Sequence, residues 1–431
     1  MPLRLDARAA DFEQAFAAFL AMKREASADV DDAVRAILAD VQARGDAALV
    51  DLSRRFDRVD LEALGLRVSA DDLAAAEAAC EPRALDALRF AHGRIRAFHE
   101  RQRPEDERFV DALGVELGWR WTAVESVGLY VPGGTASYPS SVLMNAVPAK
   151  VAGVERLAMV VPAPDGRINP LVLAAARVAG VDEVFRVGGA QAVAALAYGT
   201  ATIAPVAKIV GPGNAFVAAA KRRVYGTVGI DMIAGPSEVL IVADASANPD
   251  WIAADLLAQA EHDAAAQSIL LTDDAALADA VCAAVERQLA TLPRAEIAGA
   301  SWRDFGCVIL CGDLAAALPL VDRIAPEHLE IMTEAPDALA QKVRNAGAIF
   351  IGGHTPEAIG DYVGGSNHVL PTARSARFSS GLGVLDFMKR TSILKCAPDS
   401  LRSLADAAIA LGEAESLTAH ARSVAIRLNR G

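Results

Sequence analysis

The residues best suited to metal or acid–base chemistry are histidines with carboxylate or amide neighbours. Gln259 and His262 stand three residues apart in a predicted helix, so they share one face and could point at one metal ion. A single Gln-x-x-His pattern is weak evidence, and a capping or surface role stays open for both residues.

A second candidate pair is Glu327 and His328, at the predicted start of a strand. Adjacent carboxyl and imidazole groups could supply two acid–base groups of different pKa to one site. Neighbours in a strand face opposite ways, which leaves open that one of the two is only structural.

A polar, glycine-rich segment at residues 360–368 contains Asp361 and His368. Such loops often line functional sites, although a tight surface turn would have the same composition. Glu415 and His420 lie in predicted helices near the end of the chain and, taken alone, would be solvent-exposed residues.

The sequence has no complete dinucleotide fingerprint. Gly211-Pro212-Gly213-Asn214-Ala215-Phe216 contains the first two glycines of GxGxxG, but Phe216 occupies the place of the third. If NAD binds, it must bind in another manner. Residues 230–238, which include Ser237, match no general motif.

The elements that would position these residues form an α/β pattern. Residues 1–120 are predicted to be mostly helical, and strand-length apolar runs then alternate with helical stretches. Two such series predict two α/β units with parallel sheets and a cleft between them, with ligands beyond the carboxyl ends of the strands. The predicted strands are residues 127–131, 157–161, 184–187 and 209–210, then 239–243, 269–272, 308–311, 329–332 and 349–352. Two amphipathic helices, at residues 401–411 and 417–428, could form a dimerisation arm or a simple C-terminal cap.

Charge and composition exclude several classes of partner. The 431 residues carry a formal net charge of −13, which disfavours nucleic acid and anionic membranes. No apolar run approaches a membrane span, and the acidic N-terminus does not have the pattern of a signal peptide. The five cysteines are scattered without a CxxC pair, so we expect reduced thiols, a cytoplasmic protein and no thiolate zinc site.

Taken together, these segments resemble the histidinol dehydrogenase family in order and spacing over about residues 120–425. One such piece would be weak evidence, whereas eight in order are highly specific. The matching stretches are residues 128–134, 187–192, 211–216, 230–238, 259–262, 326–329, 360–362 with 367–371, and 417–420.

The resemblance implies a role for each matching position. Gln259, His262, Asp361 and His420 correspond to zinc ligands, and Glu327 and His328 correspond to the catalytic pair. Tyr130, Gln191 and Asn214 correspond to NAD contacts. The substrate contacts implied are Ser237, Gln259, His262, His328, Asp361, Glu415 and His420.

The implied activity is the NAD-dependent, four-electron oxidation of L-histidinol through L-histidinal to L-histidine, the last steps of histidine biosynthesis. One Zn²⁺ per subunit would orient the substrate, His328 would accept the alcohol proton, and Glu327 would activate water for the second oxidation. Another amino alcohol as substrate, a metal-dependent hydrolase and a protein with a purely structural metal are the alternatives. The acid–base pair argues against the last of these.

The family's fold implies two incomplete Rossmann-like α/β domains without GxGxxG, a helical N-terminal layer and a small helical C-terminal tail, similar to the aldehyde-dehydrogenase-like fold. We expect residues 26–129 with 237–380 to carry most of the metal and catalytic site, and residues 130–236 to contribute the NAD contacts. Residues 1–25 with 381–431 would form the dimerisation arm. Glu415 and His420 would then enter the site of the neighbouring subunit of a homodimer.

Overall fold

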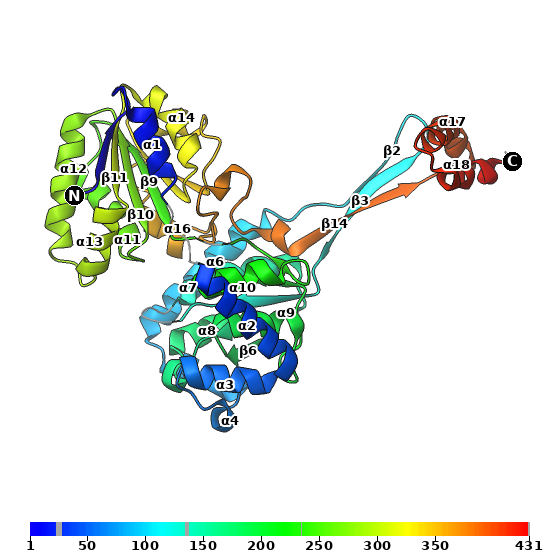
Figure 1. Cartoon of the computed structure of the whole chain (residues 1–431), viewed down its shortest axis with the longest axis horizontal. Coiled ribbons are helices and arrows are strands. Elements are labelled where there is room, and N and C mark those ends of the chain that lie inside the picture. Colours follow the sequence, from blue (N-terminus) through cyan, green and yellow to red (C-terminus); the bar gives the residue numbers. More distant parts are fainter. Residues whose placement is uncertain (23–27, 134–137, 234, 430–431) are drawn as a thin grey trace.

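The computed structural model describes residues 1–22, 28–133, 138–233 and 235–429 (Figure 1). Gly134 and Ala234, which belong to two of the family-like stretches, and the predicted domain boundary at residues 25 and 26 lie outside the described residues.

A five-stranded parallel sheet occupies the middle of the chain, in the order β6-β5-β4-β7-β8. Its strands are β4 (Ser126–Tyr130), β5 (Arg156–Val161), β6 (Glu183–Arg186), β7 (Lys208–Val210) and β8 (Gly229–Ile230). The first predicted strand series is therefore confirmed. The chain builds outward from β4 to β6 and then returns to place β7 on the other side of β4, which creates a topological switch point between β4 and β7.

Helices cover both faces of this sheet because its strands bury side chains in both directions. One face packs against α5 (Ala70–Ala79), α6 (Pro82–Glu100), α7 (Pro139–Ala152) and α8 (Pro170–Val178). The other packs against α2 (Ala28–Arg44), α3 (Asp46–Phe56), α4 (Leu61–Leu64), α9 (Gly189–Tyr198) and α10 (Ala215–Val224).

A six-stranded parallel sheet has the order β1-β11-β10-β9-β12-β13 and confirms the second predicted series. Its strands are β1 (Leu3–Asp6), β9 (Glu238–Ala243), β10 (Gln267–Thr272), β11 (Cys307–Leu310), β12 (His328–Met332) and β13 (Ala348–Ile351). One face packs against α11 (Pro249–Ala260), α12 (Ala275–Leu289) and α13 (Ala295–Asp304). The other packs against α1 (Phe12–Leu20), α14 (Leu314–Ile324) and α15 (Pro336–Ala340), and α16 (Glu357–Tyr362) follows β13.

The way the elements pack differs from the predicted domain grouping. Helices α2 to α6 pack on the five-stranded sheet, although we expected them to accompany residues 237–380. Strand β1 pairs with β11 of the six-stranded sheet, although we expected residues 1–25 in the dimerisation arm. Helical periodicity reveals which face of a helix is buried but not which sheet receives it, and the pairing of β1 with β11 joins segments about 300 residues apart.

An antiparallel ribbon extends away from the two α/β units and carries two helices at its far end (Figure 1). The ribbon contains β2 (Glu107–Val110), β3 (Glu116–Ala123) and β14 (Met388–Lys395), and the helices are α17 (Pro398–Ala414) and α18 (Thr418–Ala425). We call these five elements the arm. The two helices were predicted, whereas β2 and β3 lie in a region that was expected to be mostly helical.

Short 3-10 turns complete the structure at η1 (Pro164–Gly166), η2 (Ser375–Arg377), η3 (Val384–Phe387) and η4 (Ile426–Leu428). Within the described ranges, no helix combines the length and the apolar character that crossing a membrane requires.

Phe185 of β6 allows a test of the core that joins the N-terminal helices to the five-stranded sheet. Its side chain is 0% exposed and belongs to the same cluster as Val34 and Leu38 of α2. We expect Phe185→Ala to lower the free energy of unfolding by about 3–5 kcal/mol, because the truncation leaves a cavity. Phe378→Ala is the control, since Phe378 is 78% exposed. Equal effects of the two substitutions in denaturant titrations would contradict this packing.

Candidate active site

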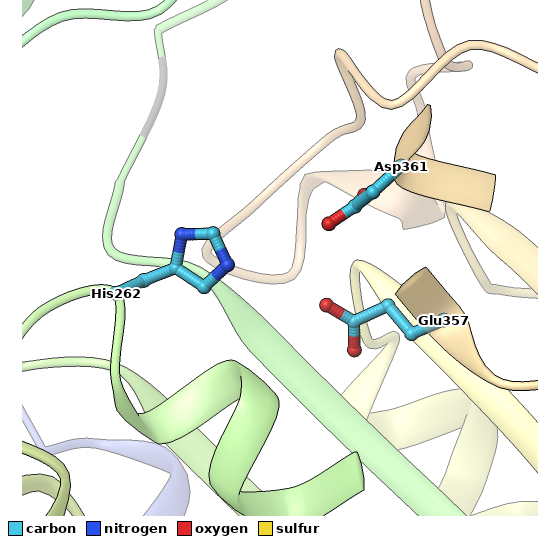
Figure 2. Close-up of side chains that lie close together, drawn as sticks. All are labelled: His262, Glu357 and Asp361. Atoms are coloured by element: carbon cyan, nitrogen blue, oxygen red, sulfur yellow. The ribbon is translucent and has the colours of Figure 1, made fainter. Parts of the chain in front are cut away.

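Three potential metal ligands converge beside the six-stranded sheet: His262, Glu357 and Asp361. One ligand atom from each lies within 4.8 Å of the others, and Figure 2 shows the ring and the two carboxylates pointing toward one another. His262 lies just beyond the end of α11, whereas Glu357 and Asp361 are four residues apart and share a face of α16. The structure thus brings two of the predicted metal ligands, His262 and Asp361, to one point.

Gln259, the third predicted ligand on this part of the chain, lies one helical turn before His262. Its side chain is buried, and its Oε1 atom has no hydrogen-bond partner among the described residues. Burying an amide oxygen without a partner is costly, so such an atom is a good candidate for binding a cation. The donor set of an imidazole, an amide oxygen and carboxylates is suited to a catalytic metal ion.

Glu327 and His328 both bind the backbone of Glu238, at the amino end of β9. The Glu327 carboxylate accepts a hydrogen bond from the Glu238 amide (2.9 Å), and Nδ1 of His328 lies 3.1 Å from the Glu238 carbonyl. Because a carbonyl only accepts, Nδ1 must carry the proton, and Nε2 of the neutral ring keeps its lone pair. Both side chains therefore reach the same place, although neighbours in a regular strand would diverge.

His328 is buried, and its Nε2 atom has no hydrogen-bond partner in the described part of the chain. Burial lowers the pKa of His328 to about 4, and the Asp361 carboxylate, 3.9 Å from Nε2, offsets only part of that effect. A solvent-exposed imidazole has a pKa of about 6.5. The structure instead holds this imidazole neutral, with a free base aimed toward Asp361.

This cluster lies at the amino ends of β9 and β12, whereas we had expected ligands beyond the carboxyl ends of the strands. Ser237 directly precedes β9, and Glu327 directly precedes β12. The connecting helix α11 runs back to this edge after β9 and so delivers Gln259 and His262 there. The site is therefore built where the end of α11 meets the amino ends of β9 and β12.

The predicted NAD contacts lie at the carboxyl edge of the other sheet. Tyr130 ends β4, Gln191 lies in the first turn of α9, and Asn214 is the N-cap of α10, where it accepts hydrogen bonds from two backbone amides. The Tyr130 hydroxyl accepts a hydrogen bond from the Gly189 amide (3.0 Å), and burial raises the pKa of Tyr130 to about 12. Tyr130 and Gln191 are buried, so Asn214 is the one of the three that is exposed.

His368 links this edge to the metal-ligand cluster. Its Nδ1 donates to the Asp361 carbonyl (2.9 Å), and its Nε2 lies 3.4 Å from the Ser141 hydroxyl in the first turn of α7. Asn367 beside it donates to the Met144 carbonyl of α7 (2.7 Å). The segment that the sequence singled out thus connects the helix following β4 to α16.

Glu415 and His420 are not brought to the cluster within one chain. They lie in the helical tip of the arm, where both are exposed, and Figure 1 shows this tip far from α16. Exposed apolar side chains also mark the arm, among them Leu394, Leu411 and Leu417.

Glu357 is the site residue that sequence reasoning missed. Burial raises its pKa well above the usual range, and the Asp361 carboxylate adds to that effect. Its Oε1 atom lies 3.8 Å from Nδ1 of His328. We expected a loop at residues 360–368 and so did not use the four-residue spacing that places Glu357 and Asp361 on one face of α16.

Comparisons with known proteins agree on one family. A sequence model described as histidinol dehydrogenase matches residues 20–428. A histidinol dehydrogenase of Bradyrhizobium diazoefficiens is 71% identical over 429 residues, and one of Rhodopseudomonas palustris is 70% identical over 430 residues, each covering 100% of both chains. The crystal structure of a histidinol dehydrogenase from Elizabethkingia anophelis is similar with a TM-score of 0.95 at 34% identity, covering 99% of this chain and 98% of that one.

The buried neutral imidazole of His328 predicts a contribution to stability that depends on pH. Its pKa is about 4 in the folded chain and near ~6.5 in an unfolded one. Protonation therefore favours the unfolded chain, and stability is lost as the pH falls below the unfolded pKa. Between pH 7 and pH 5, we expect the free energy of unfolding of the wild type to fall by about 2 kcal/mol more than that of His328→Asn.

The measurement is a series of denaturant titrations with a metal chelator present, so that metal release does not contribute. His354→Asn is the control, because His354 is exposed and should follow the wild type at each pH. Parallel curves for wild type and His328→Asn would show that His328 is not held neutral by burial.

Proposed function

We propose, on the premise that the chain belongs to the histidinol dehydrogenase family, that it oxidises L-histidinol through L-histidinal to L-histidine with zinc and NAD⁺. The observation that carries this proposal is the buried Nε2 atom of His328, which has no partner among the described residues and lies 3.9 Å from Asp361 of the metal-ligand cluster. This arrangement places a proton acceptor next to a cation site, as the oxidation of a bound alcohol requires.

The zinc ligands in this proposal are Gln259, His262 and Asp361, completed by His420 of the partner subunit. The buried Gln259 oxygen without a partner and the close approach of His262 and Asp361 support this assignment. A bound zinc ion would supply a template for the imidazole and amino nitrogens of histidinol and Lewis acidity at the reacting oxygen. Glu357, the third member of this cluster, is a further buried carboxyl group beside the proposed zinc position.

In the first oxidation, Nε2 of His328 takes the proton of the alcohol while NAD⁺ accepts the hydride. The hydrogen bond from Nδ1 to the Glu238 carbonyl fixes the tautomer that makes Nε2 the base. Asp361 faces Nε2 and stabilises the imidazolium that forms. A low pKa in the resting site keeps this ring in its neutral form, with Nε2 unprotonated, at neutral pH.

In the second oxidation, Glu327 accepts a proton from the water that adds to histidinal. Its carboxylate is held by the Glu238 amide, beside His328. The complete reaction consumes one water and two NAD⁺ and yields two NADH and three protons with the carboxylate of histidine. Ser237, Gln259, His262, His328 and Asp361, with Glu415 and His420 of the partner subunit, are the proposed substrate contacts.

The proposed NAD site is the switch point between β4 and β7, with Tyr130, Gln191 and Asn214 at its edge. Asn214 opens α10, and the positive end of a helix dipole favours phosphate there. A chain with a net charge of −13 repels phosphate overall, so it needs a local positive potential of this kind to bind the cofactor's phosphates. His368 and Ser141 connect this edge to the metal-ligand cluster, which supports bringing cofactor and substrate together.

The proposed active unit is a homodimer in the cytoplasm. His420 and Glu415 lie on an arm that holds them away from their own chain's cluster and exposes several leucines for burial against a partner. The five cysteine thiols are free, as in a reducing compartment.

A stoichiometry tests the proposed reaction. With limiting L-histidinol and excess NAD⁺, we expect two NADH for each histidinol consumed, with activity lost on chelation and restored by zinc. One NADH would mean that the aldehyde is released and that the role of Glu327 is wrong. No NADH from folded, zinc-loaded protein would contradict the proposed substrate.

Mixed dimers test whether the site is shared. His262→Ala and His420→Ala should each be inactive, but after subunit exchange about one quarter of wild-type activity should return, because half of the dimers regain one of two sites. His262→Ala mixed with Asp361→Ala is the control and should stay inactive. Both substitutions affect the ligands that one chain supplies to its own cluster, so neither site of the mixed dimer is intact. No recovery in the first mixture after verified exchange would show that the chains do not share a site.

A further inference from the structure

A buried ion pair lies directly behind the loop that leads into α10. Lys221 of α10 and Asp231, which follows β8, are 2% and 1% exposed at their side chains and bind each other closely. The resemblance assigns no role to either residue, although Asp231 lies in the family-like stretch at residues 230–238. Both approach Gly211, the residue that follows β7 at the switch point.

The pair holds the Gly211 backbone from two directions. The Asp231 carboxylate accepts a hydrogen bond from the Gly211 amide (2.8 Å), and the Lys221 ammonium donates to the Gly211 carbonyl (3.0 Å). Gly211 has a φ of 112°, and a Cβ atom added there would lie 2.1 Å from the Tyr130 carbonyl oxygen. The backbone is thus pressed against the end of β4, in a conformation that favours glycine.

Holding Gly211 in place also constrains the next residues of the loop. Pro212, Gly213 and the N-cap Asn214 occupy the three positions between Gly211 and the first residue of α10. Lys221 belongs to α10, the helix that Asn214 caps. The ion pair therefore connects Gly211, at the start of the loop, to the helix that follows the loop. The exposed face of this loop is the one proposed to meet NAD.

We infer that Lys221 and Asp231 are positioning residues that preorganise the loop at residues 211–214 for the dinucleotide. This inference rests on the proposed NAD site. A buried ion pair is generally a weak source of stability and can often be replaced by apolar side chains. Its bonds to a single glycine at the cofactor edge indicate a role in shaping that edge, since a preorganised loop binds without the cost of ordering.

The same sheet offers a control ion pair at its opposite edge, which is less buried, with side chains 28% and 19% exposed. Arg156, at the start of β5, binds Glu183 (2.9 Å) and donates to the carbonyls of Ala204 and Pro205. This cation also joins a carboxylate to a backbone loop, but at the amino ends of the strands. Its replacement should therefore leave the cofactor edge unchanged.

The test is equilibrium binding of NADH to the full-length protein, followed by fluorescence. We expect K221M/D231L, which removes both bonds to Gly211 without leaving an unpaired charge, to bind NADH at least ~10-fold more weakly. K221M/D231N keeps an acceptor for the Gly211 amide, so its affinity for NADH should fall by a smaller factor. This second variant keeps the inference testable if the first one does not fold. In turnover, the KM for NAD⁺ should rise by a larger factor than the KM for histidinol, while R156M/E183Q should match the wild type in both.

The outcomes separate this inference from the proposed function. Wild-type protein that neither binds NADH nor reduces NAD⁺ with histidinol would contradict the proposed function itself. A wild type that binds NADH, with K221M/D231L and K221M/D231N binding it equally well, would overturn the inference. A loss of NADH affinity as large in R156M/E183Q would also overturn it, because the effect would then belong to the sheet as a whole.

Discussion

The candidate site depends on one peptide backbone, that of Glu238 at the amino end of β9. Its amide binds the Glu327 carboxylate, and its carbonyl binds Nδ1 of His328. These two bonds align the start of β12 with the start of β9 and determine which imidazole nitrogen is available as a base. On the other side of β12, Gly347 allows the start of β13 to approach Glu327 closely, because a Cβ atom there would lie 2.5 Å from the Glu327 carbonyl oxygen. The acid–base pair is thus a product of the pairing between β9 and β12.

The second constraint is electrostatic. Burial raises the pKa values of Glu330 and Glu357 well above their usual range, and it raises that of Asp255 to about 6. The Glu357 amide donates to Glu330, so the helix that carries Asp361 begins on a buried carboxyl group of β12 in the six-stranded sheet. Concentrating carboxyl groups in a poorly solvated place costs free energy unless protons or a cation compensate. This cost is a physical reason for the proposed zinc ion at the same point.

The sequence predicted the elements better than it predicted their assembly. Strand-length apolar runs located the strands of both parallel sheets from β4 to β13, apart from the two-residue β8, because buried parallel strands are nearly continuous in hydrophobicity. The spacing of Gln259 and His262 gave a shared helix face, but Glu327 and His328 could not be placed without knowing that both meet Glu238. Nothing local distinguished which sheet receives helices α2 to α6. The four exposed residues of β2 and the mostly half-buried residues of β3 lack the pattern of a core strand. His420 could be assigned only through the family resemblance, because its own surroundings are exposed.

The two sheets use opposite edges, which explains how one site can draw on both. The residues proposed to contact NAD lie at the carboxyl edge of the five-stranded sheet, beside the switch point between β4 and β7. The metal-ligand cluster stands at the amino edge of the six-stranded sheet, because α11 returns Gln259 and His262 to that edge. Ser141 and His368 bridge the two places through α7 and α16. On the proposed function, the arm of the partner subunit then adds His420 to the ligands that one chain supplies. Assembly of the dimer would therefore be a condition for chemistry and not only for stability.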